Sequence, residues 1–569
     1  MRSLSIHESF AGRNVLLTGA SGFLGKVWLT MMLQRAPGIG RIYVLLRQKA
    51  LRPARDRFEK MVASSPCFKP LHERYGADLG RFIAERVEVV DGDIGLPGLG
   101  LDDATAARLA GELDLVVNCA GLVDFDPDLR DALGTNVDGC LHVADFLARC
   151  ERAALLHIST CYVAGTRNGE IPEELIANYA PSGAPFDARA EYDDARAAIA
   201  QILADYDTPE KEAEIHLDTV KHIRERGLDP NNETLVRNIS RRLKRTAIKD
   251  AMIAEGQDRA KRWGWTNIYT YSKSLGESLL APYLGKFKLS LLRPAIVESA
   301  MEYPFPGWNQ GFNTSGPLSY MLGGWFRQLP MRRGNPFDVI PVDYVCRAMS
   351  IAGAALIEGE HRLVYQCGSS DKNRLTIDRA CELTALAHRK HLRRKGDSAV
   401  DRIVLSRWDS VPSDGEEAFS VPNLRKAAKD FTEAMRDLPR RWPKFVRRKA
   451  EDAAKEVDKV DEKLETIEKL VDLYRPFILD NFFVFKTDAL QSHGVVEPEF
   501  QFDPKAIDWR RYWIDVHIPG LRRWCYPLFE GKTPDSYSPR HPFALPAPAP
   551  AQPPAEARPA QAQAQGGAR

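Results

Sequence analysis

Short apolar runs alternate with helical patterns through the first 160 residues of the chain. The runs that we interpret as strands occupy residues 15–17, 41–47, 86–94, 113–121 and 154–160. Strands that alternate with helices are typical of a parallel sheet covered on both faces. The pattern therefore predicts an α/β fold with a doubly wound parallel sheet of the Rossmann type.

The alternation stops between residues 185 and 263. This segment is charged, rich in alanine and poor in glycine, and its apolar residues recur every three to four positions. Such spacing predicts a helical insertion of about two to four helices. Its basic residues are interpreted as a solvated helix face, with contact to a phosphorylated carrier or an anionic membrane as the alternative: Arg237, Arg241, Arg242, Lys244 and Arg245.

The strand pattern resumes after the insertion. Residues 1–184 and 264–370 are therefore predicted to form one Rossmann domain, and residues 371–534 a mostly helical C-terminal domain. Aromatic-rich stretches in that domain are expected to pack onto the body, although a position on lipid is also open. Residues 535–569 consist largely of Pro, Ala and Gln and are predicted to be a disordered tail.

Composition narrows the class of protein. Hydrophobic residues make up 44% and charged residues 27%, as in an ordinary soluble protein, and a net charge of +2 gives no reason to expect nucleic acid as a partner. The nine cysteines are scattered without a CxxC pair, which favours a reducing compartment and argues against a zinc site or any other metal centre. No apolar run approaches the roughly 20 residues that span a bilayer. We expect a cytoplasmic protein, with peripheral membrane association left open.

Residues 14–25 contain the stretch that points to chemistry. NVLLTGASGFLG places three glycines three residues apart between a strand and a helix. Such a turn lets the backbone approach a pyrophosphate, while the helix N-terminus directs its free N–H groups at it. The strand before and the helix after supply the context that the motif needs. The candidate cofactor residues in this turn are Thr18, Gly19, Ser21, Gly22, Phe23 and Gly25.

Further candidates stand at the ends of the other predicted strands. Arg47 occupies about the position where NAD-binding folds carry an acid for the ribose 2′-hydroxyl. A guanidinium suits a 2′-phosphate, so we favour NADPH, with a solvated basic turn as the alternative. Asp93 is a candidate for the adenine amino group or simply a turn residue, and Ala120 lets the chain pass close under a cofactor.

A Tyr–Lys pair supplies the candidate acid. Tyr269 and Lys273 are four residues apart and share a helix face, and a nearby ammonium is expected to lower the pKa of the phenol. Lys273 is also a candidate for holding the nicotinamide ribose. Thr160, or less favourably Ser159, would hydrogen-bond the substrate carbonyl, and Asn136 could hold a water. Tyr271 is expected to face away from Lys273.

These residues resemble a known family. TGASGFLG, NCAG, the Ser/Thr strand end and YTYSK are similar to extended short-chain dehydrogenases/reductases. More narrowly, TGASGFLGKV, HISTCYVAG, YTYSKSLGE, RPAIVESAMEYPFPGW and DVIPVDYV resemble the fatty acyl-CoA reductases. The resemblance implies reduction of long-chain acyl-CoA with NADPH, through an aldehyde, to a primary alcohol. It implies that Thr160, Tyr269 and Lys273 are catalytic.

Other functions remain open at this stage. The same fold could release the aldehyde, reduce a sterol or a carrier-protein thioester, sense a nucleotide without catalysis, or serve as a membrane scaffold. Cys161 directly follows Thr160, and its thiolate could form an acyl-enzyme, although in a strand it would point the opposite way. Five aromatic residues either line a closed apolar pocket or pack in the core: Phe305, Trp308, Phe312, Trp325 and Phe326.

Overall fold

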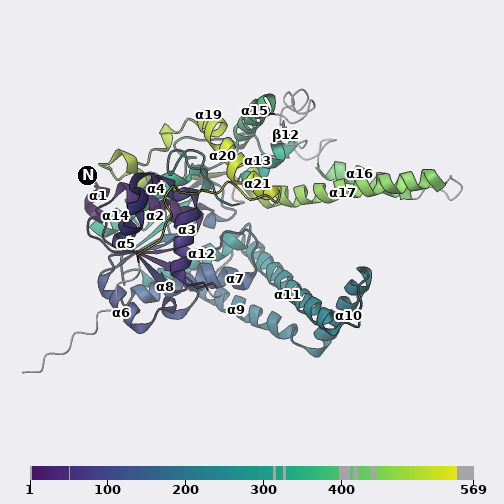
Figure 1. Cartoon of the computed structure of the whole chain (residues 1–569), viewed down its shortest axis with the longest axis horizontal. Coiled ribbons are helices and arrows are strands. Elements are labelled where there is room, and N and C mark those ends of the chain that lie inside the picture. The colour runs from purple at the N-terminus through teal and green to yellow at the C-terminus, as the bar shows by residue number, and fades with distance from the viewer. Residues whose placement is uncertain are drawn as a thin grey trace, which may run out of the picture.

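A seven-stranded sheet forms the centre of the computed structural model (Figure 1). The structure describes residues 3–49, 52–311, 315–323, 328–395, 411–413, 421–436 and 444–546. The strand order is β11-β7-β5-β4-β1-β2-β3, and every neighbouring pair is parallel. The strands are β1 (Val15–Thr18), β2 (Ile42–Leu46), β3 (Val87–Asp91), β4 (Leu115–Asn118), β5 (Ala154–Ile158), β7 (Leu289–Pro294) and β11 (Val364–Cys367).

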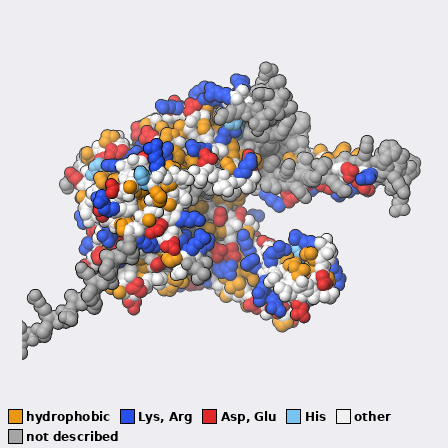
Figure 2. Space-filling view, viewed as in Figure 1, with side chains coloured by type: hydrophobic (Ala, Val, Ile, Leu, Met, Phe, Trp, Pro, Cys, Tyr) orange, Lys and Arg blue, Asp and Glu red, His pale blue; other side chains and the backbone are white. Residues whose placement is uncertain are grey.

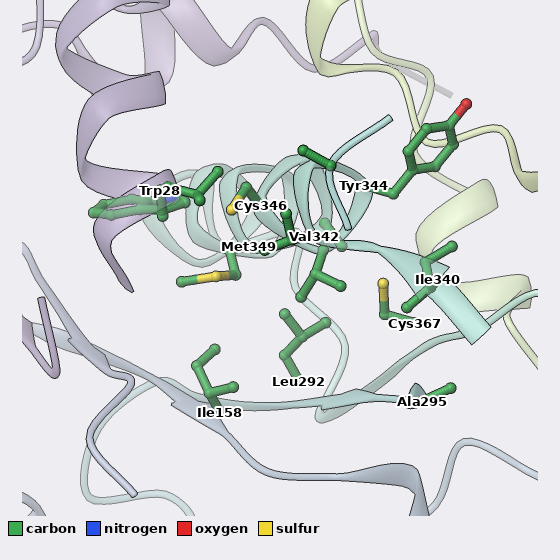
Figure 3. Packing of buried hydrophobic residues seen from close by; sticks show 14 of the residues in the cluster. Trp28, Ile158, Leu292, Ala295, Ile340, Val342, Tyr344, Cys346, Met349 and Cys367 are labelled. Carbon is green, nitrogen blue, oxygen red and sulfur yellow. The ribbon is translucent and has the colours of Figure 1, made fainter. Parts of the chain in front are cut away.

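Both faces of the sheet are covered by helices, which confirms the predicted doubly wound fold. Val15 and Leu17 pack into one core with α2 (Phe23–Arg35) and α14 (Val342–Glu358), whereas Leu16 packs into another with α6 (Asp103–Glu112) and α8 (Gly139–Leu147). Successive strand residues point to opposite faces, so a strand buried on both sides is apolar throughout. Figure 3 shows the first of these cores, in which α14 lies over Ile158 and Leu292 with Trp28 of α2 beside it.

Shorter helices complete the layers around the sheet. Helix α1 (Ile6–Phe10) packs against α14, and α7 (Leu129–Leu133) packs against α12 (Ile268–Leu280). On the side of β2 and β3 the chain forms α3 (Ala54–Ser64), α4 (Lys69–Tyr75) and α5 (Leu79–Arg86). The polar candidate residues stand at the carboxyl ends of the central strands.

Residues of the predicted insertion form an arm. It consists of α9 (Ala188–Asp205), α10 (Pro209–Glu225) and α11 (Glu233–Trp263), which extend away from the sheet (Figure 1). At its base the buried Arg259 pairs with Glu191 at 2.9 Å and with Glu255 at 2.7 Å. Lys and Arg side chains surround the end of the arm in Figure 2. Of the five basic residues expected to form a solvated face, Lys244 is half-buried and bonds Asp207, and the other four are exposed.

The C-terminal part is tied to the sheet domain by strand pairing and aromatic packing. Strand β13 (Phe483–Phe485) pairs in parallel with β6 (Gly169–Ile171). Aromatic side chains of this region are buried rather than exposed, as expected for packing onto the body: Phe485, Phe500, Tyr512, Trp513 and Trp524. Helices α16 (Val421–Arg436) and α17 (Lys444–Arg475) pair with each other and extend outward (Figure 1). None of the helices in the described part of the chain is long and apolar enough to cross a membrane.

The predicted disordered tail needs a correction over its first part. Residues 535–546 lie against α4, where the His72 ring is 5.5 Å from that of Tyr537 and 6.2 Å from that of Phe543. Phe543 and Leu545 are partly buried on the main core. Composition averaged over the tail concealed these aromatic and aliphatic anchors, which bury enough apolar surface to pack. Residues 547–569 lie outside the described residues.

Candidate active site

The glycine turn between β1 and α2 allows three backbone segments to meet. Gly19 has a φ of +72°, and a Cβ on it would lie 2.6 Å from the Ala120 nitrogen. A Cβ on Gly25 would lie 2.5 Å from the carbonyl oxygen of Gly19. Gly22 caps α2 without a side-chain hydrogen bond, so the first N–H groups of the helix have no capping side chain. The turn is a cradle that side chains would fill, and it fits the diphosphate of a dinucleotide.

Thr18 joins this turn to the neighbouring strand end. Its hydroxyl donates to Oδ1 of Asn118 at 2.7 Å and accepts from the Ala120 N–H at 3.1 Å. The backbone of Ala120 is therefore held directly beside Gly19. Ser21 is exposed in the turn, and Phe23 is half-buried at the first position of α2.

Arg47 and Asp93 lie at the ends of the next two strands in the sheet order. Arg47 directly follows β2 and is exposed, and Asp93 follows β3 and is half-buried. Because β1, β2 and β3 are parallel neighbours, these positions share one edge with Gly19. The Asp93 carboxylate accepts the Gly95 N–H at 2.9 Å, so it has a turn role whether or not it also contacts adenine.

The structure brings Tyr269 and Thr160 together. Thr160 lies just beyond β5 and is buried; its hydroxyl is 3.4 Å from the Pro294 carbonyl and lies beside the phenol of Tyr269, where it can stabilise the phenolate through a hydrogen bond. Burial raises the pKa of Tyr269 to about 12, while the bond from Thr160 opposes that rise because it stabilises the phenolate. The phenol is therefore protonated at neutral pH and can donate a proton. Ser159, the alternative, has a buried hydroxyl with no hydrogen-bond partner among the described residues.

The expectation that Lys273 lowers the pKa of Tyr269 is not met. The Lys273 ammonium is buried and donates to the Ile158 carbonyl at 2.7 Å. Burial lowers the pKa of Lys273 itself, and the nearby Glu277 partly opposes this effect. Desolvation of Tyr269 outweighs any help from the ammonium, since removing a phenolate from water is costly. Helical spacing predicted a shared face, but only the packing decides what the ammonium reaches.

Asn136 forms hydrogen bonds with the protein itself. It lies in a π-helical turn, Gly134–Asp138, and its amide donates to the Leu122 carbonyl and the Ser272 hydroxyl, both at 3.0 Å. Its Oδ1 accepts the Leu122 N–H at 2.9 Å. These bonds fix the segment after Ala120, so the side chain holds the edge of the site in place.

One pair near the site was missed by the sequence analysis. Glu277, one turn after Lys273 on α12, accepts two hydrogen bonds from the guanidinium of Arg293 at 2.6 and 3.0 Å. Both side chains are buried. Burial disfavours the charge on Arg293, but Glu277 raises its pKa overall. The four-residue spacing from Tyr269 through Lys273 to Glu277 was the available signal.

Two competing residues lie outside the site. The Tyr271 hydroxyl points into the base of the arm and donates to Glu191 at 2.7 Å, so it faces away as expected. The Cys161 thiol is buried, donates to the Arg293 carbonyl at 2.9 Å, and has a pKa raised by burial. A protonated thiol that is engaged with a backbone carbonyl is a poor nucleophile.

Aromatic rings border the site, but they are not the ones expected from the sequence. Phe125 accepts the Tyr269 N–H through its carbonyl at 3.0 Å, and its ring lies 5.6 Å from Tyr474 and 5.7 Å from Phe477. Among the predicted lining residues, Phe305 and Trp308 pack against Trp524. Their ring centres lie 6.1 and 5.1 Å, respectively, from the ring centre of Trp524. Phe312, Trp325 and Phe326 lie outside the described residues.

Comparison with known proteins identifies the family. Residues 17–349 match the NAD-binding family described as male sterility protein. The chain belongs to this family. It is 29% identical over 533 residues to fatty acyl-CoA reductase 1 of Arabidopsis thaliana. This alignment covers 90% of this chain and 97% of that protein. It is 28% identical over 535 residues to the alcohol-forming fatty acyl-CoA reductase of Simmondsia chinensis, covering 91% and 98%.

The predicted resemblance to fatty acyl-CoA reductases is therefore confirmed at the level of the family. A solved structure has the same fold: the terminal R domain from the myxalamid PKS-NRPS biosynthetic pathway. It matches with a TM-score of 0.50 at 16% identity, over 92% of this chain and 93% of that one. The Rossmann-type domain of this family member is thus a nicotinamide dinucleotide-binding domain.

Proposed function

We propose that the protein reduces long-chain fatty acyl-CoA to a primary fatty alcohol, through a fatty aldehyde, with NADPH as the reductant and release of coenzyme A. The observation that carries this proposal is the Tyr269–Thr160 hydroxyl pair beside the glycine turn of a fatty acyl-CoA reductase family member. Relatives named as fatty acyl-CoA reductases, one of them alcohol-forming, match along nearly their whole length and support it.

The two hydroxyls account for activation of the carbonyl. In this proposal Thr160 and Tyr269 donate hydrogen bonds to the thioester oxygen, where negative charge develops as the carbon is attacked. When bound, NADPH would supply the hydride for that carbon. Tyr269 then gives its proton to the oxygen, which its high pKa permits because the phenol is protonated at neutral pH.

The product of the first reduction is a hemithioacetal. Its C–S bond breaks as its hydroxyl proton returns to the Tyr269 phenolate, and the thiolate of coenzyme A leaves and takes a proton from water. The remaining aldehyde presents the same kind of oxygen to Thr160 and Tyr269, so one set of groups serves a second reduction with a second NADPH. The buried Lys273 ammonium would hold the nicotinamide ribose on this side of the sheet.

The stoichiometry tests this function. Purified protein is given limiting palmitoyl-CoA and excess NADPH, and the NADPH oxidised is counted per coenzyme A released. We expect about two NADPH per coenzyme A and a fatty alcohol product. About one, with free aldehyde, would indicate an aldehyde-forming reductase, and no oxidation would contradict the acyl-CoA assignment and favour another carbonyl substrate.

The preference for NADPH depends on Arg47 in this proposal. We expect Arg47→Ala to raise the KM for NADPH by about tenfold or more, because a charge-assisted bond to the 2′-phosphate is lost. The KM for NADH should stay within about twofold. Steady-state kinetics with both cofactors measure the change. Arg41→Ala is the matched control, since Arg41 is exposed at the opposite end of the same strand and pairs with Glu88 at 3.2 Å. An equal change for both cofactors would contradict the assignment.

A further inference from the structure

A group of cationic side chains lies on the C-terminal part, away from the residues assigned so far. Helix α15 (Ile377–Lys395) ends in the sequence HRKHLRRK, which contains no acidic residue. Helix α20 (Ile518–Trp524) adds Arg522 and Arg523 beside it. The helix dipole favours cations in the last turn of α15, so those residues alone do not indicate a ligand.

Arg522 is different, because it is half-buried and its contacts are not anionic. Its guanidinium donates to Nδ1 of His388 and lies 5.7 Å from the centre of the Tyr526 ring. Nε2 of His388 is 2.9 Å from the Ser319 carbonyl, which can only accept. Nε2 therefore carries the proton, and the ring that faces Arg522 is neutral. In the described part of the chain, no carboxylate forms an ion pair with Arg522, and burial lowers its pKa.

The neighbouring cations are satisfied in an ordinary way. Lys390 pairs with Asp515 at 2.6 Å, and Arg523 pairs with Asp535 at 2.9 Å. On the arm, Arg237, Arg241, Arg242 and Arg245 are exposed to water, which solvates their charge. A desolvated guanidinium that faces a neutral imidazole has a free energy cost that an anionic ligand would offset.

The position of this group relative to Tyr269 suggests which anion it receives. Helix α13 (Gly316–Gly323) packs against both α15 and α17, and its Ser319 hydroxyl bonds the Tyr526 hydroxyl at 2.6 Å. Tyr474, in the last turn of α17, reaches Phe125 beside Tyr269. Figure 1 shows α13, α15 and α20 gathered together near the base of α17. The aromatic border of the site and the cationic group are thus connected through α13 and α17.

We infer that Arg522, together with the cationic end of α15, binds the phosphate groups of the coenzyme A headgroup while the thioester lies at Thr160 and Tyr269. This inference rests on the proposed function. Coenzyme A carries a diphosphate and a 3′-phosphate, and the planar guanidinium matches phosphate oxygens with two parallel hydrogen bonds. The headgroup thus lies apart from the glycine turn that receives the dinucleotide.

The test compares two substrates of one enzyme. Arg522→Gln keeps a polar side chain beside His388 but removes the charge. We expect it to raise the KM for palmitoyl-CoA by about 10–100-fold, the loss of a charged hydrogen bond. Reduction of hexadecanal, which has no phosphate, should stay within about twofold. Arg523→Gln is the matched control and should change neither, because Arg523 is exposed and already paired.

A third substrate distinguishes the two phosphate sources. If Arg522 binds the 3′-phosphate, wild type and Arg522→Gln will have equal KM values for palmitoyl-dephospho-CoA; if it binds the diphosphate, the difference will persist. Equal losses with palmitoyl-CoA and hexadecanal, or no loss with either, would overturn the inference alone. Wild type that reduces hexadecanal but not palmitoyl-CoA would overturn the proposed function and this inference with it. Should Arg522→Gln fail to fold, Arg393→Gln/Arg394→Gln, on the exposed surface of α15, carries the same expectation.

Discussion

Tyr269→Phe is expected to lower kcat for both palmitoyl-CoA and hexadecanal by about 10²–10⁴-fold. The substitution removes the hydroxyl that hydrogen-bonds Thr160 and leaves the ring in place. Both reductions should fall together, because one proton donor serves both carbonyls in the proposed mechanism. NADPH binding, measured by quenching of protein fluorescence, should not change. Retention of either activity would contradict the role of Tyr269.

Tyr271→Phe is the matched control for this experiment. It removes the 2.7 Å bond to Glu191 at the base of the arm, and we expect some loss of stability with kcat within about twofold. The pH dependence gives an independent check. Because the pKa of Tyr269 is about 12, its ionisation should cause no loss of aldehyde reduction below about pH 10. A fall with an apparent pKa near 8 would show that Lys273 lowers the pKa of the phenol after all.

Glu277→Gln is expected to lower the free energy of unfolding by about 3–5 kcal/mol. The substitution leaves the Arg293 guanidinium charged and buried without its counter-charge, with the neutral amide oxygen of the new side chain and the Glu174 carbonyl at 2.9 Å as acceptors. It also removes the carboxylate that raises the pKa of Lys273, so that pKa should fall further. Urea denaturation followed by circular dichroism measures the change in stability.

An ion pair between a buried arginine and an exposed carboxylate provides the comparison. Glu302 also accepts from an arginine, Arg347, at 2.6 Å, but its side chain is 60% exposed. Glu302→Gln should therefore cost no more than about 1 kcal/mol, because water already solvates the Glu302 carboxylate and the buried Arg347 keeps Asp343 at 3.8 Å as a counter-charge. The double variant Glu277→Leu/Arg293→Met should recover most of the loss, since it leaves no buried charge without a partner. Equal losses for Glu277→Gln and Glu302→Gln would contradict this account.

The candidate site residues in the glycine turn have a local signal in the sequence. Gly19, Gly22 and Gly25 were identified because a tight turn between a strand and a helix requires small residues at close spacing. Thr160 and Tyr269 are far apart in the sequence, yet each has a local signal of its own, because one stands at a strand end and the other in a recognisable YxxxK pattern. Their meeting depends on the parallel order of β5 and its neighbours, which no local pattern specifies.

The roles that were wrong or missed all depend on surroundings supplied by distant segments. Lys273 donates a hydrogen bond to the carbonyl of Ile158 on β5. The side-chain amide of Asn136 forms hydrogen bonds with Leu122 and Ser272. The first part of the tail packs because α4 presents His72 to its aromatic rings. A helical period gives the face on which a side chain lies, but not the partner that this face meets.

By itself, the sequence determined the class of fold, the dinucleotide turn and the identity of the candidate catalytic residues, because hydrophobic period and glycine spacing act over a few neighbouring positions. The tertiary structure decided the order of the strands, the pairing of Glu277 with Arg293 and the high pKa of Tyr269. These properties depend on burial, and burial is created only when segments far apart in the chain exclude water from one another.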